Sequence, residues 1–403
     1  MIKVLTAKIH ELVDPELALD DILNQLDMEK NLLKNTVGLL FCHVDFIETG
    51  IIEALRRKLP FDVLGCTSMF FAVSSGADTP AEEGVIMLTL TVLTSDDIEF
   101  ATGVCEPLTE TNAEDCVNAM YQKTASSLGG AADLVFAFPP TLLYLPIDIT
   151  TAALDRACGG VPVFGSVALD VDVGIRTPHT IYRGSAYRDR IAILLFKGPV
   201  KPRFFSFRFP EKSALAQDAV ITGAEGCRLI GINNQPAASF LKELGLIYYD
   251  KENFSQAIPL VIENIDGTKP EVVVVQTVTP EGTLICGRNV PVGGIVNVGA
   301  IGEHYVLESA KKLFRSIKEE AGGTADGAAS GAGTWLFVVS CFLRSVVLSE
   351  GATAEVALLR QELDAFSNSW LYINSGGELC PRYTKSGKTE NQALQYSIIA
   401  CQL

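Results

Sequence analysis

The residues best placed to do chemistry follow a short, continuous apolar stretch. Residues 335–339 read Trp-Leu-Phe-Val-Val, a run typical of a strand that is buried on both faces. Cys341 and Arg344 come shortly after it, where the end of a buried strand can border a crevice. The guanidinium of Arg344 could bind the carboxylate of an amino acid or another small organic acid. We therefore expect Arg344→Ala to lose ligand binding.

Both residues also have a purely structural explanation. Arg344 could form an internal ion pair with Glu350, Glu355 or Glu378, since charged residues near clefts are often structural. Cys341 could have a pKa lowered by Arg344, but buried free cysteines are common and inert. No histidine lies near Cys341 in the sequence to act as its base, so we assign no catalytic residue.

A second candidate segment follows a predicted strand at residues 370–373. Gly376 and Gly377 offer flexible backbone, and the carboxylate of Glu378 could bind an amino group. Together with Arg344, Glu378 would then form a site for a zwitterion. The alternative is a glycine turn with an exposed acid.

Two short strands in the N-terminal half end in small residues. Residues 63–66 read Val-Leu-Gly-Cys, and residues 163–166 read Val-Phe-Gly-Ser. Such residues would let a ligand or a neighbouring backbone approach closely. Because the second copy has serine in place of cysteine, tight packing explains these positions better than thiol chemistry. The candidate ligand contacts here are Gly65, Cys66, Thr67, Gly165 and Ser166.

These strands belong to a pattern that occurs twice. A strand-helix-strand pattern covers residues 37–66 and again residues 134–167. Two further strands follow each copy, and we expect 84–93 to pair with 99–104 and 190–196 with 204–209, as antiparallel ribbons. The sequence therefore predicts a mixed α/β (α+β) fold whose N-terminal half is duplicated, over about 35–104 and 133–209.

The C-terminal half is predicted to be a second domain of mixed sheet and helices. A Gly/Pro-rich turn at residues 197–202 divides the chain into domains 1–200 and 201–403, although the boundary could equally fall after Pro210. Residues 303–320 have apolar side chains at helical spacing, and 394–401 should form the last strand. Residues 321–333 form a glycine-rich loop without the Lys-Ser/Thr of a phosphate-binding loop.

Composition and charge exclude several classes of protein. A formal net charge of −16 argues against nucleic-acid and anionic-membrane partners. Because no apolar stretch has the length of a signal peptide or a membrane span, we expect a soluble cytoplasmic protein. The ten cysteines and four histidines lack disulfide-framework and zinc spacings, so we expect reduced thiols, no metal and no cofactor.

The motifs of the C-terminal half resemble those of FIST proteins. They comprise Cys341-x-x-Arg344 after an apolar strand, an acidic helix, and then Gly377-Glu378 and Asn391. Asn391 matches the family's asparagine before the last strand. The threonine expected shortly after it is absent, which puts a polar contact from this turn in doubt.

The N-terminal half resembles the other FIST domain, centred on residues 63–67. The resemblance implies a FIST N-like domain at 1–200, a FIST C-like domain at 201–403, and an intracellular sensory module for a small ligand. We expect a non-enzymatic sensor of an amino acid or small organic acid that signals through a protein partner. The alternatives are a Cys-dependent hydrolase or transferase that uses Cys341 or Cys66, and an adaptor without a small ligand.

Overall fold

The described strands form four sheets, and three of these sheets share one arrangement. The structure is a computed structural model that describes residues 1–74, 81–170, 178–208, 214–246, 258–263, 270–299, 302–322, 334–363, 369–384 and 387–403. In each of the three similar sheets, a parallel pair of strands lies at the centre and two antiparallel strands flank it on either side.

Six described strands lie side by side in each of the three similar sheets. The order across the first sheet is β1 (Lys3–Ile9), β6 (Leu88–Ser95), β2 (Asn35–Cys42), β3 (Val63–Thr67), β10 (Thr180–Tyr182) and β11 (Ser185–Tyr187). Across the second sheet it is β7 (Glu99–Val104), β12 (Ala192–Lys197), β8 (Leu134–Phe138), β9 (Val163–Ser166), β23 (Glu378–Tyr383) and β24 (Thr389–Leu394). Across the third sheet it is β13 (Arg203–Phe207), β25 (Ile398–Gln402), β21 (Trp335–Cys341), β22 (Ser369–Ser375), β4 (Phe71–Ser74) and β5 (Glu82–Gly84).

Hairpins are exchanged between the three sheets. The hairpin that follows β3 in the chain, β4–β5, pairs with β22 in the third sheet. The hairpin after β9, β10–β11, pairs with β3, and the hairpin after β22, β23–β24, pairs with β9. Each sheet thus contains a hairpin from a different part of the chain, and the three sheets are held together by backbone hydrogen bonds.

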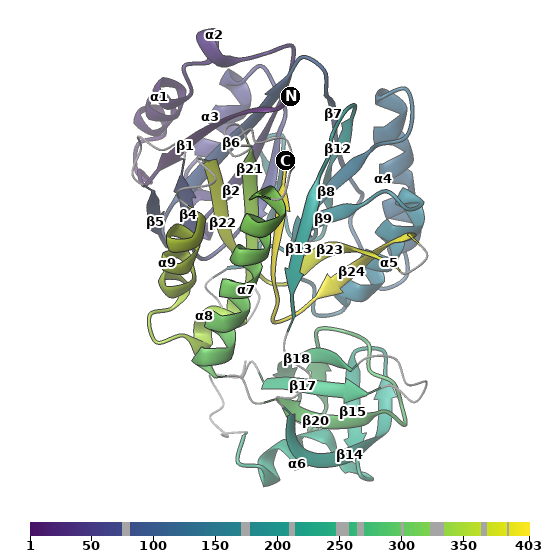
Figure 1. Cartoon of the computed structure of the whole chain (residues 1–403). Coiled ribbons are helices and arrows are strands. Elements are labelled where there is room, and N and C mark those ends of the chain that lie inside the picture. Colours follow the sequence, from purple (N-terminus) through teal and green to yellow (C-terminus); the bar gives the residue numbers. More distant parts are fainter. Residues whose placement is uncertain are drawn as a thin grey trace.

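Helices cover the outer face of each sheet (Figure 1). Apolar side chains, many of them aromatic, fill the space between the sheets. The outer helices pack in pairs, α1 with α3, α4 with α5 and α7 with α9, each pair on its own sheet. Between the sheets, the ring of Phe41 lies 5.5 Å from that of Phe138 and 5.3 Å from that of Phe337. These three rings come from the three parallel pairs, so a single apolar core joins all three sheets.

The helices have the following bounds. They are α1 (Pro15–Leu26), α2 (Met28–Asn31), the 3-10 helix η1 (Val44–Phe46), α3 (Ile51–Lys58), α4 (Ala113–Ser127), α5 (Ile147–Cys158), α6 (Ala237–Glu243), α7 (Glu303–Gly322), α8 (Phe342–Val347) and α9 (Ala352–Leu363). Asp14 caps the first turn of α1, because its side chain accepts hydrogen bonds from the N–H groups of Glu16 and Leu17.

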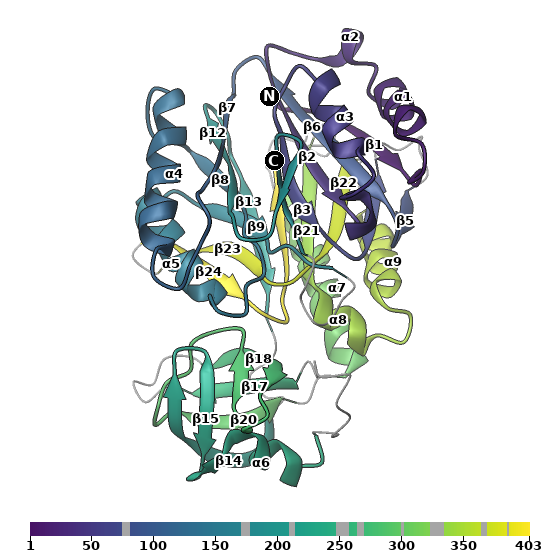
Figure 2. The same ribbon diagram turned by 180° about the vertical axis from the view of Figure 1, so that it is seen from behind.

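The fourth sheet is a closed barrel inserted between β13 and α7, and it forms a unit of its own at one end of the other three (Figure 2). Its strands are β14 (Ala214–Glu225), β20 (Ile295–Gly299), β17 (Ile258–Glu263), β18 (Glu271–Val278), β19 (Leu284–Cys286), β15 (Arg228–Ile232) and β16 (Gln235–Pro236). Pairing of β14 with both β20 and β15 closes the ring. The barrel has its own apolar core, to which α6 contributes.

The predicted mixed α/β fold and its two strand-helix-strand copies are confirmed. Strands β2 and β3 are parallel, as are β8 and β9. A third copy, β21 and β22, was not predicted, because β22 has tyrosine, isoleucine and asparagine where β3 has glycine, cysteine and threonine. The three copies are matched by a backbone hydrogen bond that each of them makes to the residue before an exchanged hairpin. The N–H group of Thr67 donates to the carbonyl group of His179, that of Val167 to Gly377, and that of Asn374 to Phe70.

The two predicted antiparallel ribbons are wrong. Strand β6 lies between β1 and β2, whereas β7 pairs with β12 in the second sheet. Likewise β12 lies between β7 and β8, and β13 pairs with β25. The hydroxyl of Ser95 accepts bonds from the N–H groups of Asp97 and Ile98. These bonds form the turn between β6 and β7, through which the chain passes from the first sheet to the second.

The predicted last strand at residues 394–401 is also corrected. The chain turns at residues 395–397, where Tyr396 has a positive φ of 55°, so that β24 and β25 belong to different sheets. Most of the predicted glycine-rich loop, 323–333, lies outside the described residues. The domain boundary near residue 200 stays a prediction.

Candidate functional site

The carboxyl ends of the three parallel pairs meet at one buried place. The thiol of Cys66 lies 3.9 Å from the carbonyl oxygen of Ser166, to which it donates. The Oγ atoms of Ser166 and Ser375 are 3.0 Å apart. We call this place the strand-end site, and its residues are Cys66, Thr67, Ser68, Ser166, Cys341, Ser375, Gly377, Glu378 and Ser397. The fold thus brings together most of the residues that were predicted at separate strand ends.

Two predicted glycines lie in this region for reasons of packing. A Cβ atom at Gly65 would lie 1.9 Å from the carbonyl oxygen of Leu40, and one at Gly165 would lie 1.9 Å from that of Ala137. Both oxygens belong to the parallel partner strand. Only glycine therefore allows the two backbones to approach this closely.

Glu378 is the most unusual residue of the strand-end site. Its side chain is completely buried, and its Oε2 atom accepts a hydrogen bond of 2.7 Å from the hydroxyl of Ser397. Its Oε1 atom has no hydrogen-bond partner among the described residues. Burial raises the pKa of Glu378 to about 8, although the bonds from Ser397 oppose this shift. At neutral pH the group is therefore mostly a neutral carboxylic acid, and Oε1 still has capacity for a hydrogen bond.

Cys341 lies beside Glu378, and neither its thiol nor that of Cys66 is activated. Burial raises the pKa of Cys66 to about 12. Burial, reinforced by the nearby Glu378, raises the pKa of Cys341 well above its ordinary value. Both groups are therefore thiols at neutral pH, whereas a nucleophile would have to be a thiolate. All ten cysteines of the chain are free.

Arg344 takes part in the internal ion pair that the sequence left open as an alternative. Its side chain is 3 % exposed, and that of Glu355 is 0 % exposed. Nε and Nη2 of Arg344 lie 3.0 and 2.5 Å from Oε1 of Glu355. Further bonds connect the pair to Val306, Ser309, Ser340, Tyr372 and Tyr396. The pair thus joins α7, α8 and α9 to the third sheet, and a ligand contact by Arg344 stays a prediction.

Asn391 lies away from the strand-end site. It is on β24, where its side-chain amide donates to Asp155 and to the carbonyl group of Val161. Its side-chain oxygen accepts a bond of 2.7 Å from the N–H group of Val163, the first residue of β9. Since the strand-end site is at the other end of β9, Asn391 connects β24 to α5 and to the start of β9.

Two side chains near Thr67, those of His179 and Arg188, could not be recognised as site residues in the sequence. Thr67 and His179 exchange hydrogen bonds, each N–H group lying 2.9 Å from its acceptor on the other residue. Nε of the exposed Arg188 lies 3.3 Å from Nε2 of His179 and donates to it. These residues reach Thr67 only because the β10–β11 hairpin joins the first sheet. Ser375, by contrast, could have been found, since it directly precedes the predicted glycine pair.

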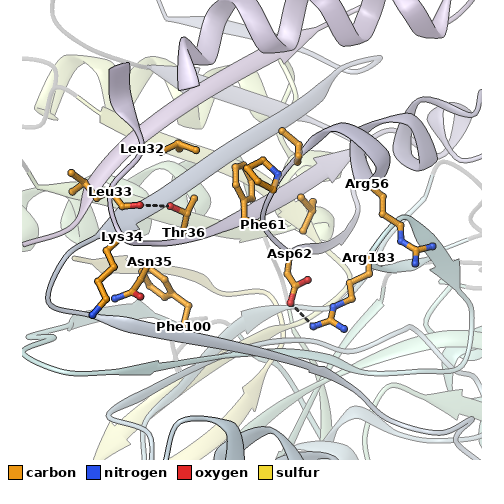
Figure 3. Close-up of a pocket in the computed structure, with 13 residues that line it drawn as sticks. Leu32, Leu33, Lys34, Asn35, Thr36, Arg56, Phe61, Asp62, Phe100 and Arg183 are labelled. Carbon is orange, nitrogen blue, oxygen red and sulfur yellow. Dashed lines mark hydrogen bonds and ion pairs between the residues drawn. The ribbon is translucent and has the colours of Figure 1, made fainter. Parts of the chain in front are cut away.

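A cavity of about 810 Å³ lies at the opposite, amino ends of β2 and β3 (Figure 3). Lys34, Arg56, Asp62 and Arg183 are its charged lining residues. Nη2 of Arg183 lies 2.6 Å from Oδ2 of Asp62, so that one positive charge is already paired. No residue predicted from the sequence as a ligand contact lines this cavity.

Comparison with known proteins identifies the family. The chain matches the FIST N domain over residues 36–235 and the FIST C domain over residues 237–381, and it therefore belongs to the FIST family. FIST domains are sensory domains of signal-transduction proteins and bind small ligands. No curated protein matches the chain.

Among solved structures, the chain is similar to the crystal structure of a cyanuric acid hydrolase from A. caulinodans. The two are 8 % identical with a TM-score of 0.39, over 100 % of this chain and 99 % of that one. Within the described ranges, none of the helices combines the length and apolarity needed to cross a lipid bilayer. The described His, Cys, Asp and Glu side chains include no group of three or more that could hold a metal ion.

Proposed function

We propose that this FIST protein is a non-enzymatic cytoplasmic sensor that binds a small polar metabolite at the strand-end site and signals through contact with another protein. The observation that carries the proposal is the Oε1 atom of the fully buried Glu378, which lacks a hydrogen-bond partner in the part of the chain that the structure describes. Burying a polar atom without a partner costs free energy, which a hydrogen bond to a ligand would recover. The other proposed contacts are Cys66, Thr67, Ser166, Cys341 and Gly377.

The proposed ligand is an amino acid or a small organic acid. A neutral Glu378 can donate to a ligand oxygen, and an ionised Glu378 can accept from an amino group. Arg188, which lies beside Thr67 through its bond to His179, would supply the positive charge that attracts a ligand carboxylate. It takes the role that the sequence suggested for Arg344, whose guanidinium is occupied by Glu355.

Ligand binding could be sensed because all three sheets contribute to the strand-end site. Ser166 belongs to the second sheet, Ser375 to the third and Thr67 to the first. A ligand that contacts all three sheets would favour the packing arrangement of the sheets to which it binds more tightly. The resulting change in the outer surface is the proposed signal to the partner protein.

The alternative of a Cys-dependent enzyme has less support. Enzymes of this class need a thiolate that is stabilised by a neighbouring base or positive charge. Burial instead raises the pKa of both candidate thiols, Cys66 and Cys341. At Cys341, the acid Glu378 adds to this opposition to thiolate formation, and Arg344 counters it to a smaller extent.

Thermal unfolding in the presence of a panel of amino acids and small organic acids tests the proposal. A ligand at one hundred times its dissociation constant adds about 2.7 kcal/mol to stability. We expect one compound class to raise the Tm of the wild type, and Glu378→Leu to abolish the shift. Glu29→Leu, at an exposed acid on α2, is the matched control and should keep the shift.

Two results would contradict the proposal. If no compound in the panel raised the Tm, the proposed ligand class would be wrong. If Glu378→Leu kept the full shift, the ligand would bind elsewhere. A chemical denaturation curve for Glu378→Leu checks that the variant folds, and Glu378→Gln, which keeps the polar side chain, is the substitute if it does not.

A further inference from the structure

A second pocket lies where the inserted barrel meets the three sheets, and three arginines line it. Its volume is about 580 Å³. Arg208 follows β13 and Arg382 lies on β23, both in the three-sheet part, whereas Arg288 follows β19 in the barrel. The two parts are joined at this pocket, since the N–H group of Val274 in the barrel donates to Oε1 of Gln395 over 2.9 Å.

The positive charge of this arginine pocket is poorly compensated. Nη2 of Arg288 lies 3.0 Å from Oε2 of Glu271, which is the only acid that lines the described pocket. Arg208 donates to the neutral amide of Gln392. Arg382 forms no ion pair with a described residue. Three guanidinium groups and one carboxylate thus line this pocket, in a protein whose net charge is −16.

Repulsion between the three arginines indicates what would bind. Desolvation, together with the nearby Arg382 and Arg288, lowers the pKa of Arg208. A bound anion would relieve this repulsion. Guanidinium groups form paired hydrogen bonds with carboxylate and phosphate oxygens, so several of them favour an anion with several such oxygens. Ser206 and Tyr383 also line the pocket, and their hydroxyl groups could donate further bonds.

We propose that the arginine pocket binds a small oxyanion with two or more negative charges, and that this anion fixes the barrel against the three sheets. Arg288 would bind it from the barrel, and Arg208 and Arg382 from the three-sheet part. This site is separate from the strand-end site. It would make the position of the barrel depend on a second metabolite.

Isothermal titration calorimetry on the full chain tests the proposal, with citrate, pyrophosphate, inorganic phosphate and acetate at constant ionic strength. We expect citrate or pyrophosphate to bind with one site per chain and acetate not to bind. The preferred probe shows whether the site takes carboxylates or phosphates. Arg382→Gln and Arg208→Gln should each weaken binding at least about tenfold. Arg382→Lys keeps the positive charge but loses the paired N–H donors of the guanidinium group, so it should weaken binding less than Arg382→Gln does.

Arg56→Gln is the matched control, because Arg56 is an exposed arginine that lines the other cavity (Figure 3). It should leave the dissociation constant unchanged. The proposal fails if none of the multivalent anions binds, or if Arg56→Gln weakens binding as much as Arg382→Gln does. Glu378→Leu should bind the anion as the wild type does. The test of anion binding at the arginine pocket is therefore independent of the test of ligand binding at the strand-end site.

Hydrogen exchange tests the second half of the proposal. The Val274 amide donates across the contact between the barrel and the three sheets, so its exchange reports opening of this contact. We expect saturating citrate or pyrophosphate to slow its exchange in the wild type but not in Arg382→Gln. Unchanged exchange in the wild type would show that the anion does not fix the barrel.

Discussion

Ser166 and Ser375 are 209 residues apart in the sequence, yet their Oγ atoms lie 3.0 Å from each other. They meet because the β23–β24 hairpin, which directly follows Ser375, pairs with β9, which ends at Ser166. The strand-end site therefore forms only when the exchanged hairpins are in place. A change that disturbs the exchange should affect both the stability of the protein and its proposed ligand binding.

Gly165→Ala should destabilise the protein by about 3 kcal/mol, since overpacking costs of this order are typical when a backbone must shift. The added Cβ atom would lie 1.9 Å from the carbonyl oxygen of Ala137, which is backbone and has no room to move. Urea denaturation measures the change. Gly223→Ala is the control, because its nearest neighbour would lie at an ordinary 3.5 Å. Equal stabilities for the two variants would refute this packing explanation.

Arg344→Met should lower the free energy of unfolding by about 3–5 kcal/mol, because it leaves the buried Glu355 without its partner. The double variant Arg344→Met/Glu355→Gln should be more stable than Arg344→Met, since it removes the unpaired charge. The exposed pair of Arg156 and Glu114 provides the control. Arg156→Met should cost less than about 1 kcal/mol. A double variant no more stable than Arg344→Met would contradict the role of this pair.

Much of the local structure could be predicted from the sequence, because hydrophobic periodicity and caps are local signals. The helix at 303–320 and the strand at 335–339 are examples, and α7 and β21 lie close to these bounds. The pairing of the strands could not be predicted. A turn such as Ser95–Asp97 looks alike whether the chain folds back or crosses to another sheet, and the exchanged hairpins pair with strands far away in the sequence.

For the candidate site too, local features could be predicted from the sequence, whereas contacts between distant segments could not. Each strand end was visible as a polar or small residue after an apolar run, and the fold brings Cys66, Ser166, Cys341 and Glu378 together. For Arg344 the sequence offered a ligand or an internal acid as partner, and only the position of α9 places Glu355 beside it. His179 could not be predicted, since it reaches the site on an exchanged hairpin.

Glu378 should make the stability of the protein fall as the pH rises. Its pKa in the folded state is about 8, above the ordinary 4.5. Between pH 4.5 and about pH 8 the folded state therefore holds a proton that the unfolded state has lost. Stability due to this group is thus fully present below pH 4.5 and declines until about pH 8. In Glu378→Gln this dependence is removed.

Denaturation midpoints of wild type and Glu378→Gln at several pH values test this prediction. The stability of the variant relative to the wild type should increase by about 3 kcal/mol between pH 5 and pH 8. Glu29→Gln, at an exposed acid, should follow the wild type across the range. A constant difference between Glu378→Gln and the wild type would mean that Glu378 titrates normally.

Thiol labelling separates the sensor from the Cys-dependent enzyme. Cys116 is the one cysteine of the ten that is not buried, so iodoacetamide at neutral pH should modify it first and slowly. Cys116→Ser should remove most of this labelling under native conditions. Rapid, stoichiometric modification of Cys66 or Cys341 would instead indicate a reactive thiolate and favour the enzyme.

The most direct test of the central claim is the carboxyl resonance of Glu378 itself. In protein labelled with carbon-13 at the glutamate side-chain carboxyl groups, Glu378 is identified as the resonance that is missing in Glu378→Gln. We predict that this resonance titrates near pH 8 and shifts when a compound that raises the Tm is added. A Glu378 resonance that titrates near its ordinary pKa, or that does not respond to such a compound, would contradict a ligand site at the strand ends.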